Sequence, residues 1–215
     1  MKLLNTLLSI TAAVAIGGFA LSPALAAAPQ EGKHYSRLQM PQPTEQPGKV
    51  EVIEFFWYGC PHCADFEPLL KPWVNKLPSD VHFRKVPAIF RAEWASGARI
   101  YYTLEALGLL DKHHDAVFNA MIKQRVNLND EKTLLDWVTK QGINRQQFAD
   151  MYKSFAVDGK VRRAAEMTQE YGFGGVPVVI VGGKYMPSPN LGTFGNMLEV
   201  VDGLIAKNRS EIKKK

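Results

Sequence analysis

The chain has little cysteine: Cys60 and Cys63 are the only two among its 215 residues. A structural zinc site built on this pair needs two further ligands. Apart from His62, the histidines are not spaced like a second half-site: His34, His82, His113 and His114. A disulfide across two residues closes a very short loop, which restricts the unfolded chain little. A redox role for the pair is favoured, and a metal site or a structural disulfide remains as an alternative.

Long hydrophobic runs are absent after the first two dozen residues. There, Lys2 precedes the uncharged apolar stretch Leu3–Leu21, and Pro23 and the small-residue pattern Ala24–Ala26 follow. This order is typical of a secretory signal peptide over residues 1–26, cleaved after Ala26. A retained membrane anchor is the alternative, because the run is nearly long enough to span a bilayer. Export would place the two cysteines in an oxidising compartment.

A basic face with interleaved aromatics, as nucleic-acid binding requires, is also missing. The net charge is +5, but much of it comes from the C-terminal residues, including Lys213–Lys215. The chain is 46% hydrophobic and 22% charged, which is sufficient apolar material for a folded core. The length allows one domain with an insertion or two small domains. We therefore expect a globular protein that does not bind nucleic acid.

Hydrophobic periodicity predicts an α/β protein interrupted by a helical stretch. Buried strands are expected over residues 49–56, 81–86 and 178–181, with a shorter edge strand at 35–38 and a glycine hairpin at 182–183 leading into 184–186. Helices are expected over residues 60–77, 93–108, 112–125, 131–141, 144–155 and 157–171, and from residue 193 onward. Two charged residues lie on otherwise apolar strand faces, namely Glu54 and Lys85.

The sequence Cys60-Pro61-His62-Cys63 lies where the first long strand passes into a helix. Cys60 is placed at the helix N-terminus, where unpaired N–H groups and the helix dipole stabilise a thiolate. Pro61 suits the first helical position, and Cys63 lies one turn inside. His62 adds a cation or an N–H donor near the Cys60 sulfur. A stabilised thiolate favours the reduced pair, so the disulfide is predicted to be an oxidant.

The chain resembles the DsbA family of periplasmic thiol:disulfide oxidoreductases, within the thioredoxin superfamily. The residues that carry the resemblance are Glu54-Phe55-Phe56, Cys60-Pro61-His62-Cys63, Phe66-Glu67 and Gly175-Val176-Pro177. The resemblance implies a thioredoxin-like fold with an inserted all-helical domain. Its parts are then the signal peptide 1–26, a thioredoxin-like first part 27–92, the helical domain 93–155 and a second part 156–215.

The resemblance also implies roles for individual residues. Pro177 is expected to be a cis-proline beside the disulfide, and Val176 to offer backbone hydrogen bonds to a substrate strand. From the residues alone, this X-Pro bond favours an ordinary trans turn. Glu54 is expected to be a buried acid that assists proton transfer at Cys63, although a paired structural carboxylate is an equal alternative. Glu67 and Lys85 resemble the companions of this acid, but alone they indicate ordinary surface charges.

The resemblance implies that the protein donates its Cys60–Cys63 disulfide to unfolded or partly folded cysteine-containing proteins in the periplasm. A DsbB-type membrane oxidase then restores the disulfide, no cofactor or metal is needed, and the protein is a monomer. A disulfide isomerase or reductase is the nearest alternative, although the lead-in 27–48 is short for a dimerisation module. A peptide-binding chaperone or thiolate copper carrier is another, using apolar surface near Trp57, Tyr58 and Val176. Trp57-Tyr58-Gly59 departs from the phenylalanine-rich family pattern.

Overall fold

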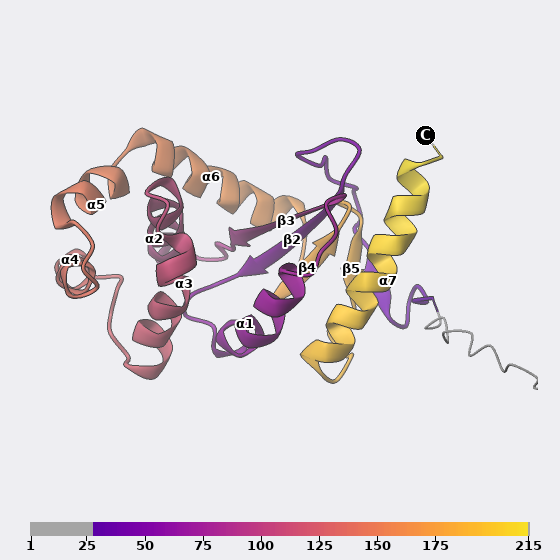
Figure 1. Ribbon diagram of the computed structural model, residues 1–215, viewed down its shortest axis with the longest axis horizontal. Helices are drawn as coiled ribbons and strands as arrows, with labels where there is room; N and C mark the ends of the chain where they lie inside the picture. The colour runs from indigo at the N-terminus through magenta and orange to yellow at the C-terminus, as the bar shows by residue number, and fades with distance from the viewer. Residues whose placement is uncertain (1–27, 215) are drawn as a thin grey trace, which may run out of the picture.

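A five-stranded mixed sheet forms the centre of the computed structural model, which describes residues 28–214 (Figure 1). The predicted signal peptide, 1–26, lies outside the described residues. The strands are β1 (Tyr35–Arg37), β2 (Val50–Phe56), β3 (Val81–Pro87), β4 (Val178–Val181) and β5 (Tyr185–Pro187). Their order is β1-β5-β4-β2-β3, with β2 and β3 parallel and the other neighbouring pairs antiparallel.

Within residues 28–214, seven α-helices accompany this sheet. They are α1 (Pro61–Val74), α2 (Ala95–Ala106), α3 (Leu110–Phe118), α4 (Glu131–Lys140), α5 (Arg145–Tyr152), α6 (Phe155–Glu170) and α7 (Phe194–Ile212), with a 3-10 turn at Ala92–Trp94 and a π-helical turn at Asn119–Lys123. Helices α1 and α7 pack on one face of the sheet and α6 on the other, while α2 to α5 gather beyond one end (Figure 1). No helix within residues 28–214 is long and apolar enough to cross a membrane.

Strand β2 is buried along its whole length, as its apolar composition predicts. Val50 and Val52 face the core formed with α1 and α7, whereas Ile53 and Phe55 face the core formed with α6. Burial of both faces is what a strand inside a sheet covered by helices on each side requires. Two acids are buried in it, Glu54 as well as Glu51, and the periodicity analysis had singled out only the former.

Most element positions agree with those predicted from periodicity, and two differ. The single helix expected over residues 112–125 is α3 followed by the π-helical turn, in which Gln124 N donates to Asn119 O five residues back. The first long helix ends at Val74, three residues early, and Leu77 is bonded in a turn after it. An apolar stripe does not distinguish hydrogen bonds to the fourth residue back from bonds to the fifth.

The β4–β5 hairpin holds the lead-in segment on the edge of the sheet. Gly182 and Gly183 both have left-handed backbone angles, with φ of 60° and 61°, which suit glycine at the two central positions of the turn that the Lys184 N–H closes onto the Val181 oxygen at 3.1 Å. A Cβ on Gly183 would lie 2.2 Å from the Gln42 carbonyl oxygen, and the Gln42 N–H donates to the Gly183 oxygen at 2.8 Å. Any side chain at position 183 would therefore collide with the lead-in segment, and only glycine allows it to pack so closely against the hairpin.

Candidate active site

The two cysteines lie at the junction of β2 and α1, as the spacing predicts. Cys60 is the N-cap of α1, with Pro61 as the first helical residue, and its N–H donates to the Trp57 carbonyl at 2.9 Å. The Cys63 N–H donates to the Cys60 sulfur at 3.4 Å, which is the capping bond of this helix. Cys60 keeps a small exposed fraction, whereas Cys63 is fully buried, and both are free thiols. A reactant from solution therefore meets Cys60 first.

The environment separates the acidities of the two thiols. The Cys63 thiol, by donating a hydrogen bond, is the largest influence that lowers the pKa of Cys60 to about 6. Burial opposes this, and the backbone N–H groups of Cys63 and His62 support it. Burial raises the pKa of Cys63, and the adjacent Cys60 sulfur raises it further. One sulfur is therefore an anion at neutral pH and the other keeps its proton.

His62 contributes to this less than its position in the motif suggests. Its side chain is exposed, and its positive charge is the smallest of the five main influences on the pKa of Cys60. Its backbone N–H, at the start of α1, contributes more. The helix terminus and Cys63 therefore provide most of the thiolate stabilisation.

The segment Val176–Pro177 lies directly against Cys60, and its peptide bond is cis. The Cys60 sulfur lies 3.4 Å from the Val176 carbonyl oxygen, which accepts a hydrogen bond from the thiol when Cys60 is protonated. The trans turn favoured by the bare sequence is therefore wrong, and the cis-proline implied by the family resemblance is present. Pairing of β2 with β4, in which Phe55 lies opposite Val178, brings together two segments that are 116 residues apart.

Beneath the cysteines, Lys85 joins two carboxylates inside the protein. Lys85 lies beside Glu54 in the β2–β3 register, and its Nζ is 2.5 Å from both Glu54 Oε2 and Glu67 Oε1. The interpretation of Glu67 and Lys85 as surface charges is wrong, because their side chains are only 9% and 15% exposed. The inward face of β3 and the covering helix α1 enclose them, which sequence position alone does not reveal.

The two carboxylates differ in acidity. Burial raises the pKa of Glu54 to about 7, although Lys85 opposes it, and the negative charge of Glu67 adds to the rise. Burial acts on Glu67 in the same direction, but the hydrogen bond from His114, together with the positive charge and hydrogen bond of Lys85, outweighs it and lowers the pKa of Glu67. Glu54 Oε1 is buried and has no hydrogen-bond partner. The shared proton is therefore held on Glu54 rather than on Glu67.

His114 completes this cluster and was missed by the sequence analysis. Its Nε2 lies 3.2 Å from Glu67 Oε1 and its Nδ1 lies 2.7 Å from the Tyr58 hydroxyl. Burial lowers the pKa of His114, so the ring is neutral, donates from Nε2 to Glu67 and accepts from Tyr58. In the sequence, His114 lies on the same helical face as the apolar residues Val117 and Phe118. This spacing indicates that His114 is buried, but it does not identify the residues that hydrogen-bond to it.

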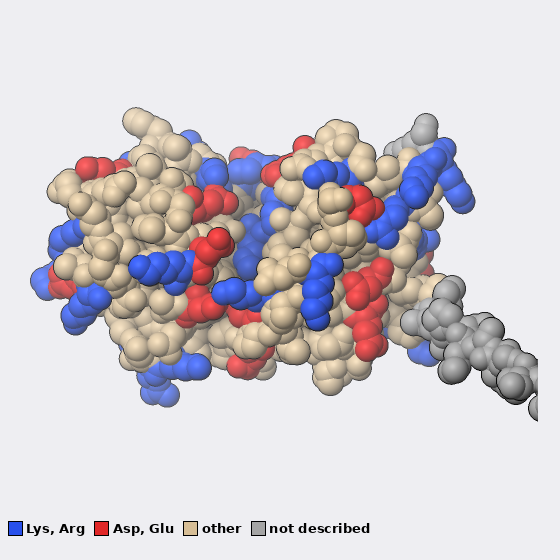
Figure 2. Space-filling view, viewed as in Figure 1, with Lys and Arg blue, Asp and Glu red and all other residues tan. Residues whose placement is uncertain are grey.

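A cavity of about 370 Å³ reaches the charged cluster from the β3 edge of the sheet. Glu67, Lys85 and His114 are among its lining residues, together with Tyr101 and Glu105. Acidic and basic side chains are interspersed around the hollow on this face (Figure 2). The cluster therefore has access to water that does not pass Cys60.

An aromatic group borders the cysteine motif on the side of the helical segment. The Trp57 and Trp94 rings are stacked, with centroids 4.0 Å apart and planes within 2°. The row continues through Phe90 to Phe173, which precedes the Val176–Pro177 segment. A Cβ on Gly59 would lie 2.3 Å from the Trp57 ring, so the glycine allows the indole to fold over the turn.

Comparison with known proteins agrees with this geometry. The family described as "DSBA-like thioredoxin domain" matches residues 85–198. The chain is 42% identical, over 98% of its length and 99% of the relative, to the thiol:disulfide interchange protein DsbA of Pseudomonas syringae pv. tomato. It is also 42% identical to DsbA of Burkholderia cepacia, over 87% of each chain. The chain belongs to the DsbA family.

Solved structures of the family show the same fold. The crystal structure of Pseudomonas aeruginosa DsbA superposes with a TM-score of 0.81 and 40% identity, covering 85% of this chain and 95% of that one. DsbA from Xylella fastidiosa gives 0.78 and 29%, covering 85% and 99%. The architecture is therefore a thioredoxin-like fold with a helical insertion, and the protein is a disulfide oxidoreductase of the DsbA type.

Proposed function

We propose that the Cys60–Cys63 disulfide of this DsbA-family protein is donated to cysteine-containing proteins that fold after export. The difference between the two thiols carries this proposal. With the Cys60 pKa lowered to about 6, the reduced pair exists at neutral pH with a stabilised thiolate, so reduction of the disulfide is favoured. A reductase needs the opposite preference.

The first step is attack of a substrate thiolate on the Cys60 sulfur. A bond forms between the substrate sulfur and Cys60, the Cys60–Cys63 bond breaks, and its electron pair leaves on Cys63. Because the Cys63 pKa is raised, that sulfur takes up a proton. Glu54 is the proposed donor, since its pKa of about 7 allows it to release and regain a proton near neutral pH.

In the second step, another thiolate of the substrate attacks the substrate sulfur of the mixed disulfide. The substrate disulfide forms and Cys60 leaves as a thiolate, which its low pKa favours. Substrate loses two electrons, and the cysteine pair gains them. Pro61 and His62 shape the helix start that holds this thiolate, through the fixed φ of the proline and the backbone N–H of the histidine.

The backbone at Val176 and the cis Pro177 are proposed to align the substrate beside Cys60. A groove of about 400 Å³ is lined by residues 173–179 and by β5 residues, and another of about 580 Å³ includes His62 and Leu69. A substrate strand lying along this edge can form main-chain hydrogen bonds and place its cysteine at the Cys60 sulfur. The Val176 carbonyl oxygen is 3.4 Å from the Cys60 sulfur, so a strand bonded to this backbone would pass directly beside Cys60.

Three further parts of the proposal rest on the family. The protein is placed in the periplasm after removal of residues 1–26, works as a monomer, and is reoxidised by a DsbB-type membrane oxidase. The helical insertion is assigned to residues 93–155, between thioredoxin-like parts at 27–92 and 156–215. Its own disulfide carries the redox change, which requires no separate redox cofactor.

Catalysed oxidation of a reduced, unfolded protein tests the proposal. The oxidised chain should accelerate disulfide formation in stoichiometric amounts, and catalytically when membranes with a quinone-linked oxidase are added. Cys60→Ser should abolish both activities. Cys63→Ser has no disulfide to donate and should also be inactive, but its Cys60 thiolate should attack a substrate that already carries a disulfide and accumulate the mixed disulfide, because no second cysteine resolves it. A glutathione equilibrium that leaves the pair oxidised under strongly reducing conditions would instead make the protein a reductase.

A further inference from the structure

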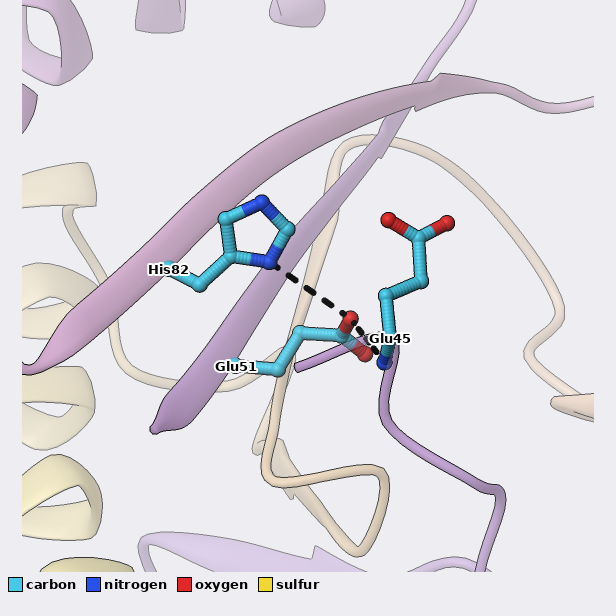
Figure 3. A group of neighbouring side chains, drawn as sticks. All are labelled: Glu45, Glu51 and His82. Carbon is cyan, nitrogen blue, oxygen red and sulfur yellow. Dashed lines mark hydrogen bonds and ion pairs between the residues drawn. The ribbon is translucent and has the colours of Figure 1, made fainter. Parts of the chain in front are cut away.

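A charged cluster beside β2, away from the cysteines, is held together by its own cation. Arg84 lies 3.2 Å from Glu51 Oε2 and 3.3 Å from Glu45 Oε1. The Glu45 N–H donates to the same Glu51 oxygen at 3.0 Å, and His82 Nδ1 lies 3.9 Å from it (Figure 3). These contacts join the lead-in loop to β2 and β3, so we assign the cluster to the stability of the fold and not to a ligand.

Exposed apolar side chains, in contrast, lie on two sides of the cysteine motif. Leu69 lines the same groove as His62, which belongs to the proposed substrate path. Phe90 belongs to the aromatic group on the side of the helical segment, which has no role in the chemistry described so far. Within residues 28–214, the large hydrophobic side chains that are exposed are only four: Met40, Leu69, Phe90 and Phe155.

The aromatic group is a row of rings that is held at both ends. Trp57, in the turn before the cysteine motif, stacks on Trp94, and the Trp94 ring centroid is 5.4 Å from that of Phe90. Phe173, just before the cis segment, is 5.5 Å from Phe90 and 4.5 Å from the buried Phe55 of β2. The row therefore extends from the turn that carries Cys60 to the segment beside which a substrate is proposed to lie.

Phe90 is the member of the row with the most open surface. It is 40% exposed, whereas Phe173 is 5% exposed. Phe90 meets both neighbouring rings edge to face, with interplanar angles of 84° and 80°. Aromatic rings favour this geometry, so a further ring or a large aliphatic side chain can pack on the open side. The charged residues between Phe90 and Trp94 have opposite signs, Arg91 and Glu93, and do not favour an ionic partner.

The place of the row determines which substrate residue it meets. The Cys60 sulfur is 3.4 Å from the Val176 oxygen, so the cysteine of a substrate strand at this edge lies opposite Val176. Antiparallel pairing is the more stable arrangement, and in it the residues after that cysteine run back toward Phe173. Side chains two residues apart point to the same face of a strand, about 6.5 Å from each other. The second residue after the substrate cysteine therefore lies opposite Gly174, beside the aromatic row.

We propose that Phe90 and Trp94 form a subsite for an aromatic or large aliphatic side chain two residues after the cysteine of the substrate. This inference rests on the proposed function, in which a substrate strand lies beside Val176. Phe173 lines the groove formed by residues 173–179, so the row is continuous with the surface proposed for the substrate backbone. Folded proteins bury most of their large apolar side chains. The subsite therefore directs the disulfide to cysteines in segments that have not yet folded.

Exchange at Cys60 in a Cys63→Ser variant tests the subsite. The variant is first converted to its mixed disulfide with glutathione. A peptide with one cysteine then exchanges with it: the peptide thiolate attacks the Cys60 sulfur, glutathione leaves as a thiolate, and no net oxidation occurs. Two otherwise identical peptides carry Phe or Ser two residues after the cysteine. Mass spectrometry of the equilibrium mixture should show the Phe peptide favoured by roughly two- to tenfold, the range for an aromatic pair.

Removal of the Phe90 ring should abolish this preference. Phe90→Ala, made in the Cys63→Ser variant, should bind the Phe and Ser peptides equally, and the exposed position leaves the buried residues intact. The matched control is Phe155→Ala, because Phe155 is 93% exposed at the start of α6, and this variant should keep the preference. A third peptide, with Phe two residues before the cysteine, should respond to Phe90→Ala no more than the Ser peptide does.

Oxidation by the complete cysteine pair gives a second measurement. A reduced peptide in which each of two cysteines has Phe at the second following position should react with the oxidised protein roughly two- to tenfold faster than its Ser counterpart. Equal preferences with and without the Phe90 ring, or a Phe90-dependent preference only before the cysteine, would overturn the subsite while disulfide donation remains. Failure of every peptide to react would contradict the proposed function, and the subsite with it.

Discussion

At the scale of single residues, the redox chemistry depends on placing like groups in unlike surroundings. Cys60 and Cys63 are three residues apart, yet one lies at a helix terminus with N–H donors and the other is enclosed in the core. Glu54 and Glu67 share Lys85 in the same way, and His114 donates to only one of them. In each pair, burial raises one pKa while hydrogen bonds lower the other.

The pKa of Cys60 should depend on the side chain at position 63. Thiolate absorbance near 240 nm should give a Cys60 pKa of about 6 in a Cys63→Ser variant, because the serine hydroxyl still donates to the sulfur. Cys63→Ala removes the largest stabilising influence, so the Cys60 pKa should be higher in that variant. Equal values in the two variants would show that the helix terminus alone stabilises the thiolate.

Glu54 should make the folded state less stable as pH rises. Its pKa is raised from 4.5 to about 7, so its contribution is largest below pH 4.5 and is lost as pH increases through 7. Glu54→Gln lacks this dependence. The free energy of unfolding of the variant, relative to the parent, should increase by up to about 3 kcal/mol between pH 4.5 and 8. Urea unfolding across that range measures the difference, and a constant difference would contradict the assignment.

Loss of the His114 donor should destabilise the protein through Glu67. His114→Leu leaves the buried Glu67 carboxylate and the Tyr58 hydroxyl each without one partner, at a cost of about 1–3 kcal/mol. His114→Gln serves as the control, because its amide can donate to Glu67. Urea unfolding at pH 7 should show the leucine variant to be the less stable, and equal stabilities would mean that packing alone determines the role of His114.

At the scale of elements, the active site is assembled from ends of secondary structure rather than from their middles. The end of β2, the first turn of α1 and the cis segment before β4 meet at the Cys60 sulfur. Backbone groups that are unpaired at such ends are free to bond a sulfur or a substrate strand. The aromatic pair Trp57 and Trp94 joins this junction to the start of the helical segment.

Gly59 should be required for that aromatic stack. In Gly59→Ala the new Cβ would lie 2.3 Å from the Trp57 ring, so the indole must leave its place on Trp94. The near-UV circular dichroism of the stacked indoles should decrease in this variant. Gly159→Ala, in the middle of α6 with no atom within 4 Å of its Cβ, should leave the signal unchanged. An unchanged signal in both variants would show that the Trp57–Trp94 stack does not require glycine at position 59.

At the scale of the whole molecule, the redox state and the stability of the fold are linked. Ionised Cys60 is stabilised only in the folded, reduced protein, whereas the disulfide form has no thiol to ionise. The other titrating groups, including Glu54, are present in both forms and largely cancel when the forms are compared. The stability difference between reduced and oxidised protein therefore reports on the cysteine pair.

That difference should depend on pH with a defined sign. The folded pKa of Cys60, about 6, lies below the value of about 8.5 for an unfolded cysteine. Stabilisation of the reduced form is therefore fully present above about pH 8.5 and is lost as pH falls through 6. In urea unfolding at pH 5, 6, 7 and 8, the free energy of unfolding of the reduced form should increase relative to that of the oxidised form as pH rises. A pH-independent difference would argue against a stabilised thiolate.

Local residue patterns were sufficient to locate the helices, the strands and the reactive cysteine pair. Alternation of apolar residues located β2, and the change to helical spacing located α1 and the position of Cys60 at its start. These features depend on neighbouring residues, and local geometry transmits them directly. The family motif added the cis bond at Pro177, for which the local sequence alone favoured the other isomer.

Contacts between distant elements, in contrast, determine which charged side chains are buried. Lys85 and Glu67 resemble surface charges until the β2–β3 register and the cover of α1 bring them to Glu54. His114 and Glu51 gain their partners from other elements in the same way. The physical reason is that burial and pairing depend on contacts between residues far apart in the chain, which no local pattern encodes.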